Sequence, residues 1–296
     1  MKTIPDVLTY YRHTRFDYRV IWDRSGVPAL HFGYYDEQAD KHAKALLNMN
    51  RVMAQHAGIR KNEQVLDAGC GVGQAAFWLT ENAGAQVTGL SVVPEQIADA
   101  RRTAAKKKVP VPTFVVGDFL SLPFPEAQFD VVWACESFCH AQDKARFFVE
   151  ARRVLKPGGR LIIADYIRTA RPLNDEQERL IREWLHPQAI PDIGTAAEYE
   201  THALAAGFSR FTAKDITPNV RVSLRNLHHL CEKWRIPGQI MRTLGLVSQI
   251  RYQNVLASIR QYEAMQAGAW QYALMLGEVT PDPAEISAPD STHIPL

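Results

Sequence analysis

Short apolar runs and longer amphipathic stretches alternate through the middle of the chain, from residue 61 to residue 167. The apolar runs have the length and composition of buried strands: Gln64–Ala68, Gln86–Leu90, Thr113–Val116, Phe129–Ala134 and Arg160–Asp165. The stretches between them have the apolar spacing of helices: Gly73–Asn82, Pro94–Lys107 and Lys144–Val154. Strands that alternate with helices of this length predict an α/β fold, with a parallel sheet covered on both faces.

The segments that flank this core have other patterns. Residues 1–60 are helical in pattern and rich in aromatic residues, and we expect a helical N-terminal lid. Residues 168–279 predict helices at Asp175–Leu185, Ala196–Ala206, 221–235 and 238–267, and strands at Ser209–Ile216 and Trp270–Leu276. The last two helices should be separated at Ile236–Pro237–Gly238, because proline and glycine both interrupt helices. Residues 280–296 contain prolines and no periodicity, which predicts a flexible tail.

Composition limits the partners and the compartment. The formal net charge is only +2 and no long basic stripe occurs, so nothing calls for a nucleic-acid partner. No apolar run reaches transmembrane length, and the first twenty residues lack the apolar centre of a secretory signal. We therefore expect a cytoplasmic protein without integral membrane association. The four cysteines form no C-x-x-C pair, so no metal site is expected.

The strongest chemical signal is a strand that runs into three alternate glycines and then into a helix: Val65-Leu66-Asp67-Ala68-Gly69-Cys70-Gly71-Val72-Gly73. Glycine suits a tight turn whose backbone approaches a ligand, and the helix N-terminus beyond it offers free N–H groups. A dinucleotide fingerprint, G-x-G-x-x-G, would bring a pyrophosphate here, which Asp67 would repel. The carboxylate instead suits a cationic ligand with an amino-acid moiety. A glycine-rich turn without any ligand is the alternative.

The pattern D-x-G-x-G-x-G resembles motif I of the class I S-adenosylmethionine-dependent methyltransferases. Later segments resemble further landmarks of that family in the same order: Val87–Leu90, Gly117–Phe119, Phe129–Trp133 and Arg153–Arg160. The likeness covers about residues 30 to 168, and the C-terminal third matches only in outline. It implies S-adenosylmethionine as cofactor and a Rossmann-like fold: a mostly parallel seven-stranded sheet flanked by helices, with the N-terminal lid and a helical insertion in the C-terminal third.

The resemblance also implies cofactor-binding residues. Asp67 and the three glycines Gly69, Gly71 and Gly73 form motif I. Ser91 stands where the family normally has an acidic residue for the ribose, a departure shared by the tocopherol, sterol and cyclopropane-forming branches, in which a following glutamine lies near the cofactor. Gln96 is that glutamine here. The remaining members of the expected set are Asp118, for the adenine amino group, Phe119, against the adenine ring, and Cys135, after the fourth strand.

Acceptor chemistry is expected from the segment after the fourth strand, since open α/β sheets bind ligands at the carboxyl ends of their strands. Transfer to a hydroxyl or an amine needs a base, and His140 is the candidate, with Asp165 to orient or ionise it. A packing histidine is the alternative. Cys139 is expected to be a buried apolar residue rather than a nucleophile. The stretch from Glu136 to Ala141 resembles that of sterol C-methyltransferases, in which a carboxylate is thought to handle a carbocation.

His31-Phe32-Gly33-Tyr34-Tyr35 resembles a lid segment of the tocopherol, sarcosine and antibiotic-sugar methyltransferases. Aromatic residues beside such a lid suit an apolar acceptor or a cation stabilised by ring faces. The expected acceptor-binding residues are Tyr18, Trp22, Tyr34 and Tyr35. Ordinary amphipathic helices packed on the sheet are the alternative for this region.

Two chemistries remain open. The first is methyl transfer to oxygen or nitrogen of a small, largely apolar molecule, with His140 as base; the second is C-methylation of an isoprenoid or sterol-like alkene, with Glu136 as the key carboxylate. A cyclopropane synthase is disfavoured because no glutamate directly precedes the histidine. A non-catalytic cofactor-binding subunit is disfavoured by the intact glycine loop, and a nucleic-acid or protein methyltransferase by the missing N/D-P-P-Y/F motif. A homodimer is compatible with the sequence, which does not define the oligomeric state.

Overall fold

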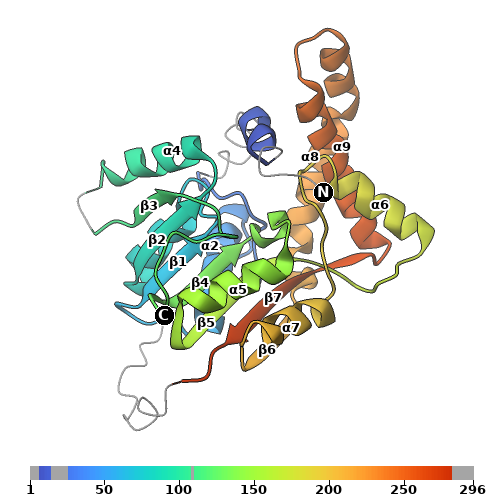
Figure 1. The fold of residues 1–296 in the computed structure, drawn as a ribbon. Coiled ribbons are helices and arrows are strands. Elements are labelled where there is room, and N and C mark those ends of the chain that lie inside the picture. The colour runs from blue at the N-terminus through green and yellow to red at the C-terminus, as the bar shows by residue number, and fades with distance from the viewer. Residues whose placement is uncertain (1–6, 15–25, 108–109, 282–296) are drawn as a thin grey trace.

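The structure is a computed structural model that describes residues 7–14, 26–107 and 110–281. Within these residues, seven strands form one sheet in the order β3-β2-β1-β4-β5-β7-β6 (Figure 1). The strands are β1 (Gln64–Ala68), β2 (Gln86–Ser91), β3 (Thr113–Val116), β4 (Phe129–Cys135), β5 (Leu155–Arg168), β6 (Arg210–Asp215) and β7 (Trp270–Glu278). The first five run parallel, whereas β7 pairs antiparallel with both β5 and β6. The predicted mostly parallel, seven-stranded α/β sheet is confirmed.

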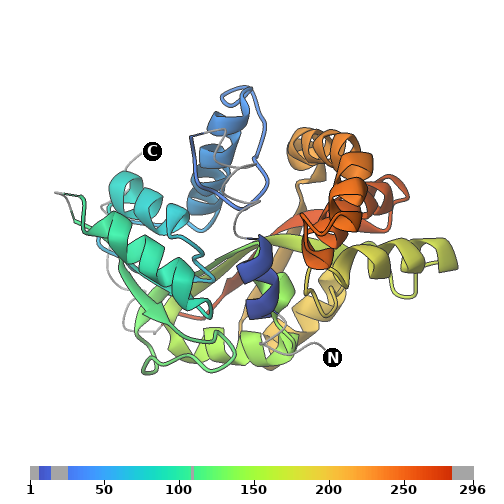
Figure 2. The same cartoon turned by 90° about the horizontal axis from the view of Figure 1, so that it is seen from above.

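Helices cover both faces of this sheet, as Figure 2 shows from above. A short helix of residues 7–14 precedes them. The others are α2 (His42–His56), α3 (Gln74–Trp78), α4 (Pro94–Ala104), α5 (Lys144–Val154), α6 (Asp175–Leu185), α7 (Ala196–Ala205), α8 (Thr217–Thr243) and α9 (Gln249–Gln266), with a π-helical turn (Leu79–Ala83) that continues α3. α6 and α7 begin with complete capping boxes at Asn174 and Thr195, which explains why both starts were predicted correctly.

The central strands are apolar on both sides because both faces of the sheet are buried. In β1, Val65 belongs to the core cluster on one face and Leu66 to the cluster on the other. The same alternation continues in β4, where Val131 and Trp133 share the first cluster and Val132 the second. All five side chains are at most 1% exposed. A strand buried on both faces reads as an unbroken apolar run, and such runs predicted β1 and β4 within one residue.

The predicted helix break at Pro237 is wrong. α8 continues through Pro237 to Thr243, and the chain turns at Gly245, whose φ of +73° and 2.9 Å bond from Leu246 N to Met241 O close the helix end. Gly238 explains the continuity: a Cβ there would lie 3.4 Å from Tyr252 Cδ2 on α9, so the two helices pack closely at this residue. Tertiary packing therefore overrides the local preference of Pro-Gly.

The expected N-terminal lid of residues 1–60 has two parts in the structure. α2 buries Met49 and Met53 in the same cluster as the sheet and lies against α3 and β5, so it belongs to the layer that covers the sheet. The helix of residues 7–14 lies instead over the carboxyl ends of the strands. Residues 15–25 and most of the expected flexible tail, 282–296, lie outside the described residues.

Candidate active site

A pocket opens at the carboxyl ends of β1 and β4, where the strand order reverses direction. This switch point is where open α/β sheets bind ligands. Its lining comes from the loops after β1, β2, β3 and β4, and from the N-terminal segment. The residues are Val7, Tyr11, Pro28, Ala29, Leu30, His31, Asp67, Gly69, Cys70, Gly71, Val72, Gln74, Ala75, Ser91, Val92, Val93, Gln96, Asp118, Phe119, Leu120, Cys135, Glu136, Ser137, His140 and Gln142.

The three glycines of the loop serve different ends. All three have positive φ, +100° at Gly69, +53° at Gly71 and +86° at Gly73. A Cβ on Gly69 would lie 2.3 Å from Ser137 Cβ, and one on Gly73 would lie 2.6 Å from Phe114 Cζ, so these two glycines allow close packing. At Gly71 the nearest such atom is Leu30 Cδ1 at 3.8 Å. Gly71 therefore leaves space on the pocket side of the loop, while Gly73 does not line the pocket.

Asp67 lies at the floor of the pocket with only 2% of its surface exposed. Burial raises the pKa of its carboxyl to about 7. Among the described residues, no donor reaches its Oδ2. A buried carboxylate oxygen without a partner costs free energy unless a ligand supplies a donor or a positive charge. The site is therefore shaped for a cationic group.

The other expected cofactor residues surround the same pocket. Ser91 Oγ donates to Gln96 Oε1 at 2.9 Å and accepts from Val93 N at 3.1 Å, which fixes the turn after β2. Across the pocket, Asp118 Oδ1 accepts from Leu120 N at 2.9 Å. Phe119 and Cys135 also line the pocket, and burial raises the pKa of the Cys135 thiol well above its usual range, so this group is a neutral thiol.

Glu136 connects the sheet with the N-terminal segment. Its carboxylate accepts hydrogen bonds from Phe32 N at 2.6 Å, from Tyr272 Oη at 2.9 Å and from Tyr166 Oη. Burial raises the pKa of this carboxyl to about 8, against the opposing effect of these donors. The backbone at Glu136 has a φ of +48°, a conformation uncommon outside glycine. The backbone conformation and the three donors together fix the position of the Glu136 side chain. One of the donors, Phe32 N, belongs to the N-terminal segment, so this contact ties that segment to the end of β4.

His140 is oriented by contacts at both ring nitrogens. Nδ1 lies 3.3 Å from the carbonyl oxygen of Ala189, which can only accept, so Nδ1 carries the hydrogen in the neutral ring. Nε2 lies 3.0 Å from Tyr11 Oη on the helix of residues 7–14 and accepts from it. The basic nitrogen of His140 therefore faces the pocket side and a residue of the N-terminal segment.

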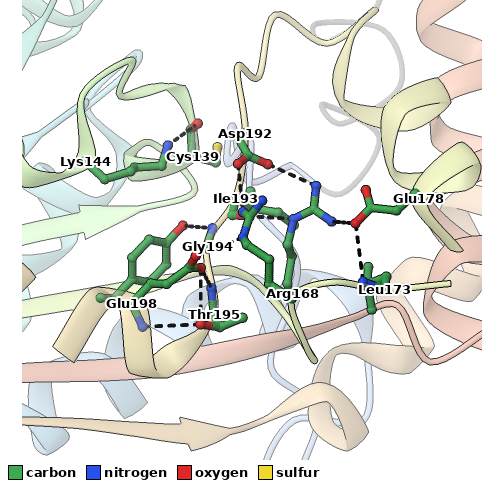
Figure 3. A network of polar contacts seen from close by, with 12 residues as sticks. Cys139, Lys144, Arg168, Leu173, Glu178, Asp192, Ile193, Gly194, Thr195 and Glu198 are labelled. Carbon is green, nitrogen blue, oxygen red and sulfur yellow. Dashed lines mark hydrogen bonds and ion pairs between the residues drawn. The ribbon is translucent and has the colours of Figure 1, made fainter. Parts of the chain in front are cut away.

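Lys144 stabilises the short turn that carries His140. Lys144 Nζ donates to Cys139 O and Ala141 O, both at 2.8 Å (the first is drawn in Figure 3). Asp165 does not contact His140, contrary to the prediction: it is fully buried, and its oxygens accept from Cys139 N and Tyr166 N, both at 2.8 Å. Asp165 does not line the pocket, and through Cys139 N it supports the backbone of the turn.

A second polar network holds the loop that supplies the Ala189 carbonyl (Figure 3). Arg168, 6% exposed at the end of β5, donates to Ile193 O at 2.9 Å and pairs with Glu178 at 2.9 Å and Asp192 at 3.1 Å. The loop from α6 to α7 is thereby fixed between two helices. His140 is thus oriented through a loop far along the chain, which no local sequence motif indicates.

Tyr34 and Tyr35, expected at the acceptor, do not line the pocket. Tyr34 N donates to Ala45 O on α2, and Tyr35 N donates to Asn219 O on α8, both at 2.9 Å, so the backbone there is bound to the flanking helices. Tyr18 and Trp22 lie outside the described residues. Residues that the sequence reasoning missed include Tyr11, Pro28 and Leu30. Only the neighbouring His31-Phe32-Gly33 motif indicated this segment.

Comparisons with known proteins identify the family and agree with the fold. A family profile described as "Methyltransferase domain" matches residues 66–163. The chain is 33% identical, over 66% of its length and 71% of the relative's, to 27-O-demethylrifamycin SV methyltransferase of Amycolatopsis mediterranei. It is 30% identical, over 70% of its length and 55% of the relative's, to sterol 24-C-methyltransferase of Pneumocystis carinii. In fold it resembles the cyclopropane synthase MmaA2 of Mycobacterium tuberculosis (TM-score 0.78, 15% identity, 94% and 99% of the two chains covered).

The protein belongs to the class I S-adenosylmethionine-dependent methyltransferases, in the branch that includes tocopherol and sterol methyltransferases. S-adenosylmethionine is its cofactor. The chain's own residues fit that cofactor, because the unpartnered buried oxygen of Asp67 and the open space at Gly71 lie in one pocket. No helix among the described residues is long and apolar enough to cross a membrane.

Proposed function

We propose that this methyltransferase transfers a methyl group to an oxygen or nitrogen atom of a small, largely apolar molecule, with His140 as the base. The observation that carries the proposal is the orientation of His140, whose Nδ1 is committed to Ala189 O while Nε2 faces Tyr11 in the pocket. Transfer to a hydroxyl or an amine releases a proton, and His140 Nε2 carries the lone pair that would accept it. Tyr11 Oη marks the position where an acceptor hydroxyl would lie.

The other residues of the pocket would bind the cofactor and exclude water. S-adenosylmethionine supplies a methyl group on an electrophilic sulfonium, so positioning accounts for most of the chemistry. In this proposal Asp67 binds the ammonium group, and Gly69 and Gly71 let the backbone approach. Gln96 and Asp118 contact the ribose and the adenine, with Phe119 beside the ring. Ser91 and Cys135 complete the wall, and Gly73 acts only through packing.

An apolar acceptor agrees with the rest of the lining. Val7, Leu30, Val92 and Leu120 contribute apolar side chains from four different segments. The N-terminal segment supplies part of this wall and is bound to the site through Tyr11 and through Phe32 N. A wall that closes over the acceptor would exclude water from the transfer, which is the role expected of a lid.

The test compares turnover and cofactor affinity in two variants. A panel of phenols, amines and prenylated alkenes is assayed by transfer of a radioactive methyl group. His140→Ala should lower kcat for the accepted phenol or amine by on the order of 10²–10⁴ while the Kd for S-adenosylhomocysteine is unchanged. His202→Ala on α7, outside the pocket lining, is the matched control and should leave kcat unchanged. Wild-type turnover in His140→Ala would refute the assignment of the base.

C-methylation of an alkene is the second candidate, favoured by the carboxyl group of Glu136, which lines the pocket and accepts from Phe32 N and from the hydroxyls of Tyr166 and Tyr272. Such a site would stabilise a carbocation next to the pocket. Glu136→Gln would then be the damaging change, and His140→Ala would be mild. Because three donors already engage Glu136, the geometry supports His140 better.

A further inference from the structure

The α8–α9 hairpin ends in an exposed apolar tip that the active site does not use. Figure 1 shows the hairpin standing out from the body of the molecule, beside the helix of residues 7–14. Five large apolar side chains at the tip are 48–67% exposed: Trp234, Ile236, Ile240, Leu244 and Leu246. Elsewhere in the described residues, exposed large apolar side chains lie scattered. Clustered exposure of this kind marks an interaction surface.

The apolar residues form a stripe that faces away from the rest of the protein. Ile236, Ile240 and Leu244 recur every four residues, so they lie on one face of α8. Gly238, buried against Tyr252, marks the opposite face, where α9 packs. The stripe therefore points into solvent, and Leu246 extends it across the turn between the helices. A projecting tip with a convex apolar face suits a broad flat surface.

The stretch of chain around the tip is rich in basic residues. From Lys233 to Arg251 the chain contains four basic residues, Lys233, Arg235, Arg242 and Arg251, and no aspartate or glutamate. Glu232, just before this stretch, pairs with Arg235 at 3.1 Å, and Arg242 donates to Gln249 Oε1 at 3.1 Å and stacks over the Tyr252 ring. The near-neutral net charge of the whole chain conceals this local cluster. Apolar side chains, a tryptophan and basic residues together are the combination by which peripheral proteins bind anionic lipid interfaces.

We propose that the tip of the α8–α9 hairpin docks the enzyme on the surface of an anionic lipid bilayer. The exposed Ile236, Ile240, Leu244 and Leu246 side chains enter the interface, and the surrounding lysine and arginines contact the lipid phosphates. The attachment is peripheral. The inference goes beyond the proposed function, since docking needs neither the cofactor nor a particular acceptor atom.

The hairpin is also connected with the wall of the active site. Tyr10 Oη, on the helix of residues 7–14, donates to Asn254 Oδ1 on α9 at 2.9 Å, and Ile250 packs against the cluster of Val7, Tyr10 and Ala189. Val7 also lines the pocket. Docking at the tip would therefore hold the N-terminal wall of the pocket near the bilayer, the reservoir in which apolar acceptors dissolve.

The experiment is co-sedimentation of the full chain with vesicles of phosphatidylcholine alone and of phosphatidylcholine with phosphatidylglycerol. The protein should bind the anionic vesicles and lose binding at about 1 M salt, where charges are screened within a few ångströms. Leu244→Ser with Leu246→Ser should weaken binding about tenfold or more, since each leucine loses its apolar burial. Lys233→Gln should weaken binding only to the anionic vesicles. Leu204→Ser, on an exposed leucine of α7 away from the tip, is the control and should bind like the wild type.

Three results would overturn the proposal. The first is wild-type partition of the leucine double variant, and the second is no binding of the wild type to either vesicle. The third is a wild-type dimer in light scattering that the double variant dissociates, without vesicle binding, because the tip would then be an interface between two copies. Affinity for S-adenosylhomocysteine, measured by calorimetry, verifies that each variant is folded. Vesicle binding is read without turnover, so it can fail independently of the proposed base.

Discussion

At the scale of single residues, Asp67 couples cofactor binding to pH. Burial raises the pKa of its carboxyl to about 7, and only the ionised form attracts an ammonium group. The affinity for S-adenosylhomocysteine should therefore increase as the pH rises from 6 to 8. Calorimetry across this range on the wild type and on Asp67→Asn measures it. The variant should bind at least tenfold more weakly at pH 8, and its affinity should no longer change with pH near 7. Equal affinities at pH 8 would exclude Asp67 from the cofactor site.

The same carboxyl should lower the stability of the cofactor-free protein. Because its folded pKa is raised above the unfolded value of about 4, its contribution to stability is fully present below pH 4 and is lost as the pH rises through 7. Asp67→Asn keeps the neutral form at every pH. At pH 8 its Tm without cofactor should exceed that of the wild type by several degrees, and at pH 5 the difference should shrink. If the variant were less stable than the wild type at pH 8, the ionised carboxylate of Asp67 would have to be stabilised in the folded protein, contrary to this prediction.

Some site residues follow from sequence and others do not. Asp67 and Gly71 belong to one contiguous motif that follows directly from β1, whereas Gln96, on α4, was indicated only by the family resemblance; all three line the pocket. Tyr34 and Tyr35 were expected at the acceptor but do not line the pocket, because an aromatic residue beside a lid motif can equally well pack against neighbouring helices. Tyr11 and the Ala189 carbonyl meet His140 only through folding, over 129 and 49 residues of chain. Such contacts have no local signature.

At the scale of elements, the loop between α6 and α7 should act on catalysis from a distance. Arg168 and Asp192 hold this loop, which presents Ala189 O to His140. Asp192→Ala should release the loop and lower kcat about tenfold, because His140 would lose its fixed orientation. The Kd for S-adenosylhomocysteine should not change, and Asp192→Glu should restore part of kcat. Glu176→Ala, which removes an exposed ion pair on α6, is the control. An unchanged kcat in Asp192→Ala would assign the network to stability alone.

The elements also show where sequence prediction succeeds. Strands buried on both faces and helices with capping boxes were placed within a few residues, because their signals are local and strong. β5 extends from Leu155 to Arg168, well beyond the predicted Arg160–Asp165, since its ends gain strand partners in β4 and β7 that no local pattern encodes. The end of α8 was misplaced for a related reason: its contact with α9 outweighs the local preference of Pro237 and Gly238.

At the scale of the whole molecule, the N-terminal segment should respond to the cofactor. The helix of residues 7–14 contacts His140, Asn254 and, through an exposed ion pair, Glu95. Exposed pairs contribute little, so we expect the segment to open without ligand and to close over bound cofactor. Limited trypsin digestion should cut within the first 25 residues more slowly when S-adenosylhomocysteine is present. Cleavage at the hairpin tip, after Lys233 or Arg242, is the internal control and should not change. If the cofactor slowed cleavage equally at the N-terminal segment and at the hairpin tip, it would stabilise the whole protein rather than close a lid.

The position of β7 has a consequence for how the protein is made. β7 is the last strand of the described residues, yet it lies between β5 and β6 and bonds to both. While the ribosome is still adding residues before 270, β5 and β6 have no partner on that side, and β5 presents a long apolar edge. The sheet therefore closes only after β7 has been synthesised. Until then the unpaired edge of β5 is open to aggregation, and slow translation of α8 and α9 prolongs that risk.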